Sequence, residues 1–254
     1  MSLISTIRDL HRRKGRERRT LTLAEGVRLL EEALAAGITP RGAAVSPALE
    51  ATPRGVALKA RLERLRVPLE VVDDQELARL AETDGPQGIV AVIEPRQWEL
   101  EALPIPADAV IVVLDGVQDP GNVGAVARTA LGLGASALVA LSGTADHTGP
   151  KALRGSMGAL FRLPTASATL EEFLPWAERH GLAIWTTAVD GMPVSQARRS
   201  GPVALLLGNE GAGVRPELVA QARLTVAVPL QHGIESLNVA VAAGILLYEV
   251  TRER

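Results

Sequence analysis

The chain contains 254 residues, of which 47% are hydrophobic and 22% are charged, and its formal net charge is −2. This composition is typical of a soluble globular protein with one or two domains. Because the sequence has no cysteine and only four scattered histidines, it excludes disulfide and thiolate chemistry, and we expect no metal site. The N-terminus lacks a signal-like apolar core, and the longest apolar run, residues 239–248, is too short to span a bilayer. We therefore expect a cytoplasmic protein without a membrane segment.

Basic side chains are concentrated at the N-terminus. The first twenty residues hold seven of the 27 Lys and Arg residues, namely Arg8, Arg12, Arg13, Lys14, Arg16, Arg18 and Arg19. A run of this kind is either a solvated arm or an extension that binds phosphate groups, and charge by itself leaves both interpretations open.

Residues 20–95 alternate between short apolar runs and amphipathic segments. The pattern predicts strands at 21–24, 43–45, 69–72 and 89–93 and helices over 25–36, 53–66 and 74–81. This alternation indicates a small α/β domain. The following stretch, 94–106, carries three prolines and little periodicity, which is typical of a linker. We therefore divide the chain into an N-terminal domain at 1–95, a linker at 96–106 and a second domain at 107–254.

The second domain is organised around residues 114–134. Residues 109–114 form a continuous apolar run, which predicts a strand buried on both faces, and a polar glycine-containing turn follows it. A helix is expected from about Gly124, with Arg128 uncovered between Gly124 and Gly132, and then a strand at 136–141. This βαβ unit places a polar loop at the carboxyl end of its first strand, where open α/β sheets bind ligands.

Two later strands end in similar loops. Residues 203–207 lead into GNEGAG (208–213), and the strand 225–230 leads into LQHGIESLN (230–238). Loops at the carboxyl ends of parallel strands meet at one edge of a sheet, so we expect all three to converge on a single crevice. The last loop enters a helix at about 237–252, with Ser236 as the expected N-cap. That helix is apolar nearly all round, which predicts burial in the core or against a second subunit.

Further elements are expected between these loops: helices at 151–161 and 170–180 and a strand at 183–187. The glycine loop at 116–124 has the spacing G-x4-G-x2-G, which departs from the dinucleotide fingerprint, and no GK[ST] follows to make a phosphate loop. These departures argue against ATP and against a nicotinamide oxidoreductase. An ordinary βα connection remains open on the loop alone.

Taken together, three segments carry a family resemblance. DPGNVGAVARTALGLGA (119–135), LLLGNEGAGV (205–214) and VPLQHGIESLNVAVAAGILLYE (228–249) resemble, in order, the three motifs of the SpoU or TrmH branch of the SPOUT superfamily. Members of this branch are S-adenosylmethionine-dependent RNA ribose 2′-O-methyltransferases. Residues 20–95 resemble the small RNA-binding domain of the family, which is similar in fold to a ribosomal protein. One departure is Ala240, where many members have serine.

The resemblance implies a parallel-sheet α/β fold with a C-terminal trefoil knot, and a homodimer packed near that knot. It also implies a set of site residues, position by position. The active-site residues are Asn122, Arg128, Glu210, Ser236 and Asn238, and the residues that hold S-adenosylmethionine are Gly208, Val228, Leu230 and Leu237. RNA contacts are expected from the basic side chains of Arg12, Arg13, Arg18, Arg19, Lys151 and Arg154.

Three classes of function follow. The first is a methyltransferase acting on RNA ribose; the two-domain layout favours ribosomal RNA over transfer RNA as its substrate. The second is a non-catalytic RNA-binding or ribosome-assembly protein with the same fold, and the third is the oxidoreductase. Methyl transfer from a sulfonium needs no metal, but it needs in-line positioning and loss of a hydroxyl proton. Since a guanidinium stays protonated, we expect Arg128 to hold a phosphate and stabilise the developing alkoxide. Ser236 or the phosphate is then expected to relay the proton. Glu210 and Asn122 are expected to fix Arg128 and the loops.

Overall fold

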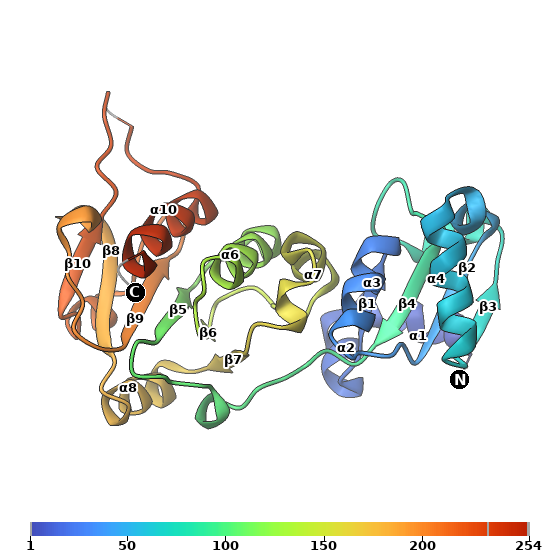
Figure 1. Cartoon of the computed structure of the whole chain (residues 1–254), viewed down its shortest axis with the longest axis horizontal. Helices are drawn as coiled ribbons and strands as arrows, with labels where there is room; N and C mark the ends of the chain where they lie inside the picture. The colour runs from blue at the N-terminus through green and yellow to red at the C-terminus, as the bar shows by residue number, and fades with distance from the viewer. Residues whose placement is uncertain (1, 233, 253–254) are drawn as a thin grey trace. The chain divides into compact units, whose positions relative to one another are not determined.

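The computed structural model describes residues 2–232 and 234–252, and the chain in it divides into two compact units (Figure 1). The first unit consists of Met1–Arg96 and Thr148–Phe161, and the second of Gln97–His147 and Arg162–Arg254. Each unit has its own β-sheet. Across 2–232 and 234–252, no helix has both the length and the apolar character needed to cross a membrane.

The first unit contains a four-stranded mixed sheet in the order β1-β4-β2-β3. Its strands are β1 (Thr22–Glu25), β2 (Gly42–Val45), β3 (Leu69–Val71) and β4 (Ile89–Ile93). The helices that follow the basic N-terminal segment are α3 (Val27–Ala35), α4 (Pro53–Arg64) and α5 (Asp74–Leu80), with a 3-10 turn at Pro47–Ala51. Each predicted strand and helix of this region is present, and the ends differ by a few residues.

The basic N-terminal segment is folded, which the charge pattern did not predict. It forms α1 (Leu3–Leu10), capped by the Ser2 side chain, and α2 (Arg13–Arg19). Ile7 and Leu10 are fully buried in the core of the first unit. Their spacing places them on one face of α1, and burial of that face holds the segment against the sheet. The segment is therefore folded onto the first unit, while the side chains of Arg12, Arg13, Lys14 and Arg18 remain exposed to solvent.

Residues 148–161 differ from the predicted domain division, which placed them in the second domain. They form α7 (Pro150–Ser156) and a 3-10 turn (Ala159–Phe161), and they belong by contact to the first unit. The Thr22 hydroxyl donates to the Thr148 carbonyl at 2.7 Å. Arg154 forms ion pairs with Glu25 and Glu82 at 3.5 and 3.1 Å. These contacts hold the segment against β1, and no sequence pattern marks them.

The second unit contains six parallel strands in the order β10-β8-β9-β5-β6-β7, as expected for an open α/β sheet. The strands are β5 (Val110–Asp115), β6 (Ala137–Leu141), β7 (Thr165–Ala168), β8 (Ala183–Pro193), β9 (Val203–Gly208) and β10 (Leu224–Ala227). The sequence pattern did not predict β7 or the short helix α9 (Pro216–Val219), and it ended β8 six residues early.

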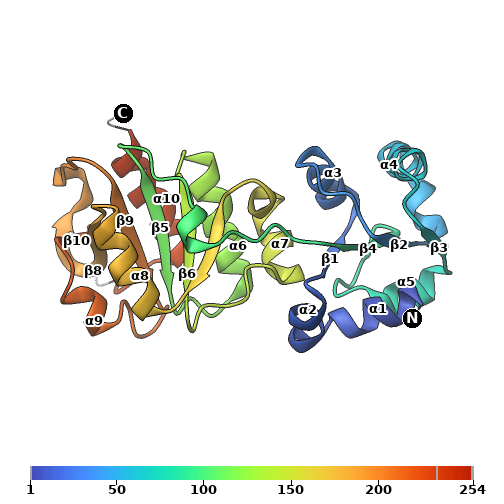
Figure 2. The ribbon, with the colours of Figure 1, turned by 90° about the horizontal axis from the view of Figure 1, so that it is seen from below.

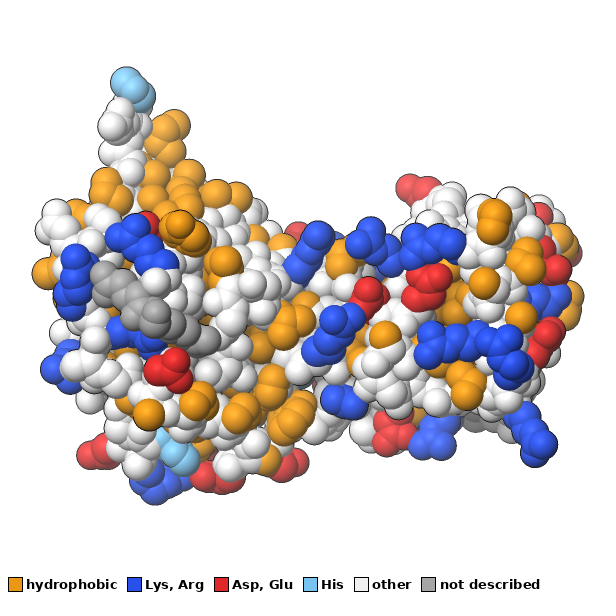
Figure 3. Space-filling model, viewed as in Figure 1, with side chains coloured by type: hydrophobic (Ala, Val, Ile, Leu, Met, Phe, Trp, Pro, Cys, Tyr) orange, Lys and Arg blue, Asp and Glu red, His pale blue; other side chains and the backbone are white. Residues whose placement is uncertain are grey.

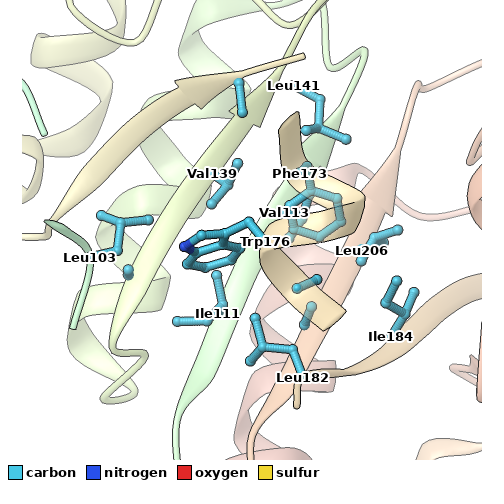
Figure 4. Packing of buried hydrophobic residues seen from close by; sticks show 14 of the residues in the cluster. Leu103, Ile111, Val113, Val139, Leu141, Phe173, Trp176, Leu182, Ile184 and Leu206 are labelled. Atoms are coloured by element: carbon cyan, nitrogen blue, oxygen red, sulfur yellow. The ribbon is translucent and has the colours of Figure 1, made fainter. Parts of the chain in front are cut away.

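Helices cover both faces of this sheet (Figure 2). On one face, Phe173 and Trp176 of α8 (Leu170–Arg179) pack on Ile111, Val113 and neighbouring strand residues (Figure 4). On the other face lie α6 (Pro120–Gly132) and α10 (Val239–Thr251), which contact each other. Such burial on both faces explains why β5 and β9 are continuous apolar runs in the sequence.

The predicted linker is partly packed. It includes a 3-10 turn at Leu100–Ala102, Leu103 is only 5% exposed, and Trp98 and Ile105 pack against the core of the second unit. From Gln97 onward, the predicted linker is thus a structural part of that unit.

Candidate active site

Three loops converge at the carboxyl edge of the parallel sheet, as the sequence predicted. They follow β5, β9 and β10, and hydrogen bonds join them. Asn122, in the first turn of α6, donates from its Nδ2 to Glu210 Oε1 at 2.9 Å. Asn238, after β10, donates from its Nδ2 to Asn122 Oδ1 at 3.0 Å. Glu210, Asn122 and Asn238 therefore form a continuous chain across residues that are 88 and 116 positions apart.

A second set of contacts fixes the loop after β9 beneath this chain. Arg215 donates from its backbone N–H and its Nε to the Asp115 carboxylate at 2.8 and 2.6 Å, and the Asp115 side chain is only 1% exposed. Asn209 donates to the Gly116 carbonyl at 2.8 Å and accepts from the N–H groups of Gly211 and Ala212. β9 pairs with β5 up to Asp115 and Gly208, so the loop after β9 starts beside Asp115. The loop that carries Glu210 is thus held at both ends.

The protonation state of Glu210 follows from its partners. Partial burial by itself raises the pKa of the carboxyl, but hydrogen bonds from the Asn122 amide and from backbone N–H groups lower it more, and the pKa lies below its usual 4.5. Glu210 is therefore ionised at neutral pH. An ionised carboxylate with a lowered pKa is a weak base, so its role here is to orient the loops.

A pocket of about 680 Å³ opens at the same edge, between the ends of β8, β9 and β10 and the start of α10. It is lined by all four predicted cofactor-binding residues, Gly208, Val228, Leu230 and Leu237, and by Glu210 and Ser236. A side chain at Gly208 would place its Cβ 2.2 Å from the Gly213 carbonyl carbon, so only glycine permits the loop to fold back over the strand end.

The predicted active-site residues do not all meet within one chain. Asn122 bonds to Glu210 and Asn238 bonds to Asn122, but neither asparagine lines the pocket. Arg128 is exposed on α6, outside the pocket lining, and its side chain makes no hydrogen bond or ion pair with any described residue. The expected fixing of Arg128 by Glu210 and Asn122 is therefore not present within the chain. The structure also corrects a cap, because Asn238 accepts from the Ala240 N–H at 2.9 Å and is the N-cap of α10 in place of Ser236.

The predicted RNA-binding side chains differ in their surroundings. Arg12, Arg18 and Arg19 all bind the Asp9 carboxylate, at 2.6–2.8 Å, and Arg19 together with Arg12 and Arg18 lowers the pKa of Asp9 to about 2. Arg13 pairs with Glu17 one turn later, and Lys151 is exposed on α7. Arg154 is engaged by Glu25 and Glu82, so its position indicates a structural role.

The sequence pattern did not single out Asp115, Asn209 or Arg215. Asp115 had a usable signal, because it is a carboxylate at the end of an otherwise apolar strand. Arg215 had none, since its partner lies 100 residues earlier.

Two comparisons with protein families match most of the chain. Residues 109–248 match the SpoU rRNA Methylase family, and residues 2–91 match the MRM3-like substrate binding domain. A relative from Bacillus subtilis, named 23S rRNA (guanosine(2553)-2'-O)-methyltransferase RlmP, is 32% identical over 96% of this chain and 93% of its own length. The chain belongs to the SpoU methylase family.

Solved structures agree with this assignment. An AdoMet-bound rRNA methyltransferase from Sinorhizobium meliloti has a TM-score of 0.88 and 30% identity, and the match covers 100% of this chain and 97% of that one. The SpoU methyltransferase AviRb from Streptomyces viridochromogenes, in complex with AdoMet, has a TM-score of 0.87 and 28% identity, covering 100% and 98%. The likeness extends over both units, each with its own sheet.

Proposed function

We propose that this chain transfers a methyl group from S-adenosylmethionine to a ribose 2′ hydroxyl of RNA, and that ribosomal RNA is the substrate. The observation that carries the proposal is the hydrogen-bonded chain of Glu210, Asn122 and Asn238, which joins three loops beside a pocket. The name of the Bacillus subtilis relative, a 23S rRNA 2′-O-methyltransferase, supports ribosomal over transfer RNA.

The pocket residues fit the cofactor. Apolar side chains of the pocket lining, including Leu207, Val226 and Leu246, suit an adenine ring. Three carboxylates also line the pocket, and none of its lining residues is Lys, Arg or His. This balance suits a ligand with a sulfonium and an ammonium group. Gly208, Val228, Leu230 and Leu237 are the residues that would hold it. The cofactor, when bound, supplies the electrophilic methyl group.

The protein groups then position the RNA and move the proton. Ser236 is exposed at the pocket lining and can relay a proton from the ribose hydroxyl. Arg128 remains the cation we assign to the neighbouring phosphate and to the developing alkoxide. Glu210, ionised and bonded to Asn122, keeps the loops after β5 and β9 in register. The 1–95 domain is assigned to RNA binding, with the basic side chains of α1 and α2 as contacts. Lys and Arg side chains are also frequent on the face of the first unit seen in Figure 3, where α3 and α4 lie in front.

A homodimer is part of the proposal. Val241, Ile245 and Tyr248 are 53%, 39% and 56% exposed and lie on one face of α10, at i, i+4 and i+7. Figure 3 shows hydrophobic side chains gathered in this part of the second unit. An apolar helix face of this kind needs a cover. A Cβ added to Gly244 would lie 3.6 Å from Thr129 Cγ2, so α6, the helix that carries Arg128, packs beside this face through Thr129.

Two further parts of the proposal are a deep trefoil knot in the chain around β9 and β10 and a cytoplasmic location. The knot rests on the likeness to SpoU methyltransferases of known structure, and the location rests on the ribosomal substrate.

The test is transfer of labelled methyl from S-adenosylmethionine to unmodified ribosomal RNA and transfer RNA in parallel, followed by nucleoside digestion. We expect label in one 2′-O-methylnucleoside from ribosomal RNA. If only transfer RNA is labelled, the proposed reaction is supported and ribosomal RNA is wrong as the substrate. Absence of both label and cofactor binding favours the non-catalytic RNA-binding function, in which the fold persists without the reaction. Light scattering at several protein concentrations tests the dimer, with Ile245→Lys as the variant expected to be monomeric.

A further inference from the structure

One segment of the pocket wall lies where the pairing between β8 and β10 is interrupted. β8 pairs with β10 at Trp185 and Thr186, and pairing resumes only at Met192, which faces Val226. Residues 187–191 therefore have no partner on β10. The segment begins at Thr187, whose hydroxyl donates to the Leu206 carbonyl at 3.0 Å. It supplies Thr187, Ala188, Val189 and Asp190 to the pocket lining.

A glycine fixes the far end of this segment. A Cβ at Gly191 would lie 2.7 Å from the Val226 carbonyl carbon and 2.9 Å from the Thr225 carbonyl oxygen. Real Cβ atoms do not approach backbone this closely, so the close contact requires glycine. Because Gly191 touches β10 and Thr187 bonds to β9, the segment between them is anchored at both ends. Its shape is a defined feature of the pocket wall.

Asp190 is the carboxylate that this segment presents. Asp190 is exposed and lines the pocket, and its side chain makes no hydrogen bond or ion pair with any described residue. By contrast, Glu210 in the same pocket already accepts from Asn122 and from the Gln118 N–H. Both oxygens of Asp190 are thus available to a ligand. Its neighbours Ala188 and Val189 are apolar, which suits the surroundings of a nucleoside better than those of a charged amino-acid group.

We propose that Asp190 accepts hydrogen bonds from the two ribose hydroxyls of the cofactor's adenosine. This inference rests on the proposed function, because it takes S-adenosylmethionine as the ligand. A vicinal diol offers two donors, and a carboxylate offers two acceptors in matching geometry. An acidic side chain at the carboxyl end of a parallel strand also meets ribose hydroxyls in the dinucleotide-binding folds. Asp190 is then a positioning residue that sets the orientation of the nucleoside.

The test is equilibrium binding by calorimetry of three ligands to the full chain and to Asp190→Asn. S-adenosylmethionine has the diol, the sulfonium and the amino-acid group; S-adenosylhomocysteine lacks the sulfonium; 5′-methylthioadenosine lacks both. The amide keeps one acceptor and loses the other, so we expect affinity to fall about tenfold or more for all three ligands alike. Asp84→Asn, the same chemical change at an exposed residue of the first unit, is the matched control and leaves all three affinities unchanged.

Other outcomes overturn the inference in distinguishable ways. A loss confined to S-adenosylmethionine assigns Asp190 to the sulfonium, and a loss shared only with S-adenosylhomocysteine assigns it to the ammonium group. Unchanged binding of all three removes Asp190 from recognition while leaving the proposed function intact. If the unsubstituted chain binds none of the three ligands, the proposed function itself fails.

Discussion

In the first unit, the polar network is made of ion pairs next to the sheet: Arg154 pairs with Glu25 and Glu82, and Glu82 also pairs with His11. In the second unit, the network lies in loops beyond the strand ends and consists of amide and carboxylate contacts around Glu210 and of the Asp115 pair with Arg215. The first arrangement fastens helices and segments to β1. The second leaves polar groups and a pocket open at one edge of a parallel sheet.

Because of this difference, substitutions in the two networks should change different measured properties. Substitutions in the first network should alter the stability of the fold and its pH dependence. Substitutions in the second should alter turnover, except at the buried pair beneath the loops, where both effects are expected.

The largest effect is expected at Arg128. Arg128→Ala should lower turnover by ~10²-fold or more, because it removes the cation assigned to the alkoxide, while cofactor affinity stays the same. Single-turnover methyl transfer and calorimetry measure the two quantities. Arg223→Ala, just before β10 at the opposite edge of the sheet, is the control. Retained activity would remove Arg128 from the mechanism.

The buried pair gives the next largest effect. Arg215→Ala leaves the Asp115 carboxylate almost fully buried without its cation, so the free energy of unfolding should fall by about 3 kcal/mol. Urea denaturation measures this change. Arg179→Ala removes an ion pair to Glu101 in which both side chains are more than half exposed, and it should cost less than about 1 kcal/mol. Equal losses in the two variants would show that the Asp115 pair is no stronger than a surface pair.

Asn122→Ala breaks both links of the chain between Glu210 and Asn238. We expect turnover to fall about tenfold, since a charged hydrogen bond is removed. The pKa of Glu210 should rise toward its usual value once its amide donor is gone, so the acidic limb of the pH–rate profile should move to higher pH. An unchanged acidic limb would mean that another group sets it.

A smaller effect is expected from the basic N-terminal segment. Replacing Arg12, Arg13, Arg18 and Arg19 together should weaken the dependence of RNA affinity on salt concentration. The slope of log affinity against log salt should become shallower by roughly 0.7 for each phosphate group of single-stranded RNA that the variant no longer neutralises. Asp9→Asn is the control, because it removes the shared partner of three of these arginines and keeps their charges. An unchanged slope in the fourfold variant would leave the segment without a role in RNA binding.

The smallest effect concerns His11. The Glu82 side chain raises the pKa of His11 above 6.5, and its other ring nitrogen lies 3.0 Å from the Leu80 carbonyl. The stability that protonated His11 provides is therefore complete below pH 6.5 and lost as the pH rises through the raised pKa. The Glu82 carboxylate, whose pKa is lowered by His11, contributes its full stabilisation above pH 4.5. The free energy of unfolding from urea denaturation should fall by less than about 1 kcal/mol above pH 6.5, and His11→Gln should abolish this dependence; if the dependence persists, it belongs to another group.

Local patterns were sufficient for much of this molecule. The sequence predicted β4 to the residue, the parallel order of polar loops after β5, β9 and β10, and the uncovered position of Arg128. It predicted burial of α10 in the core or against a second subunit, and within the chain one face of the helix is buried while Val241, Ile245 and Tyr248 are exposed. Each of these predictions depends only on residues that are neighbours in the sequence.

Tertiary structure alone decided the remaining features. Arg215 contacts Asp115 because β9 inserts beside β5, and residues 148–161 join β1 through Thr22 and Arg154. The segment that presents Asp190 exists only where β8 leaves β10 and returns. Contacts between residues far apart in the chain depend on strand order and register, which leave no periodic signal in either segment taken alone.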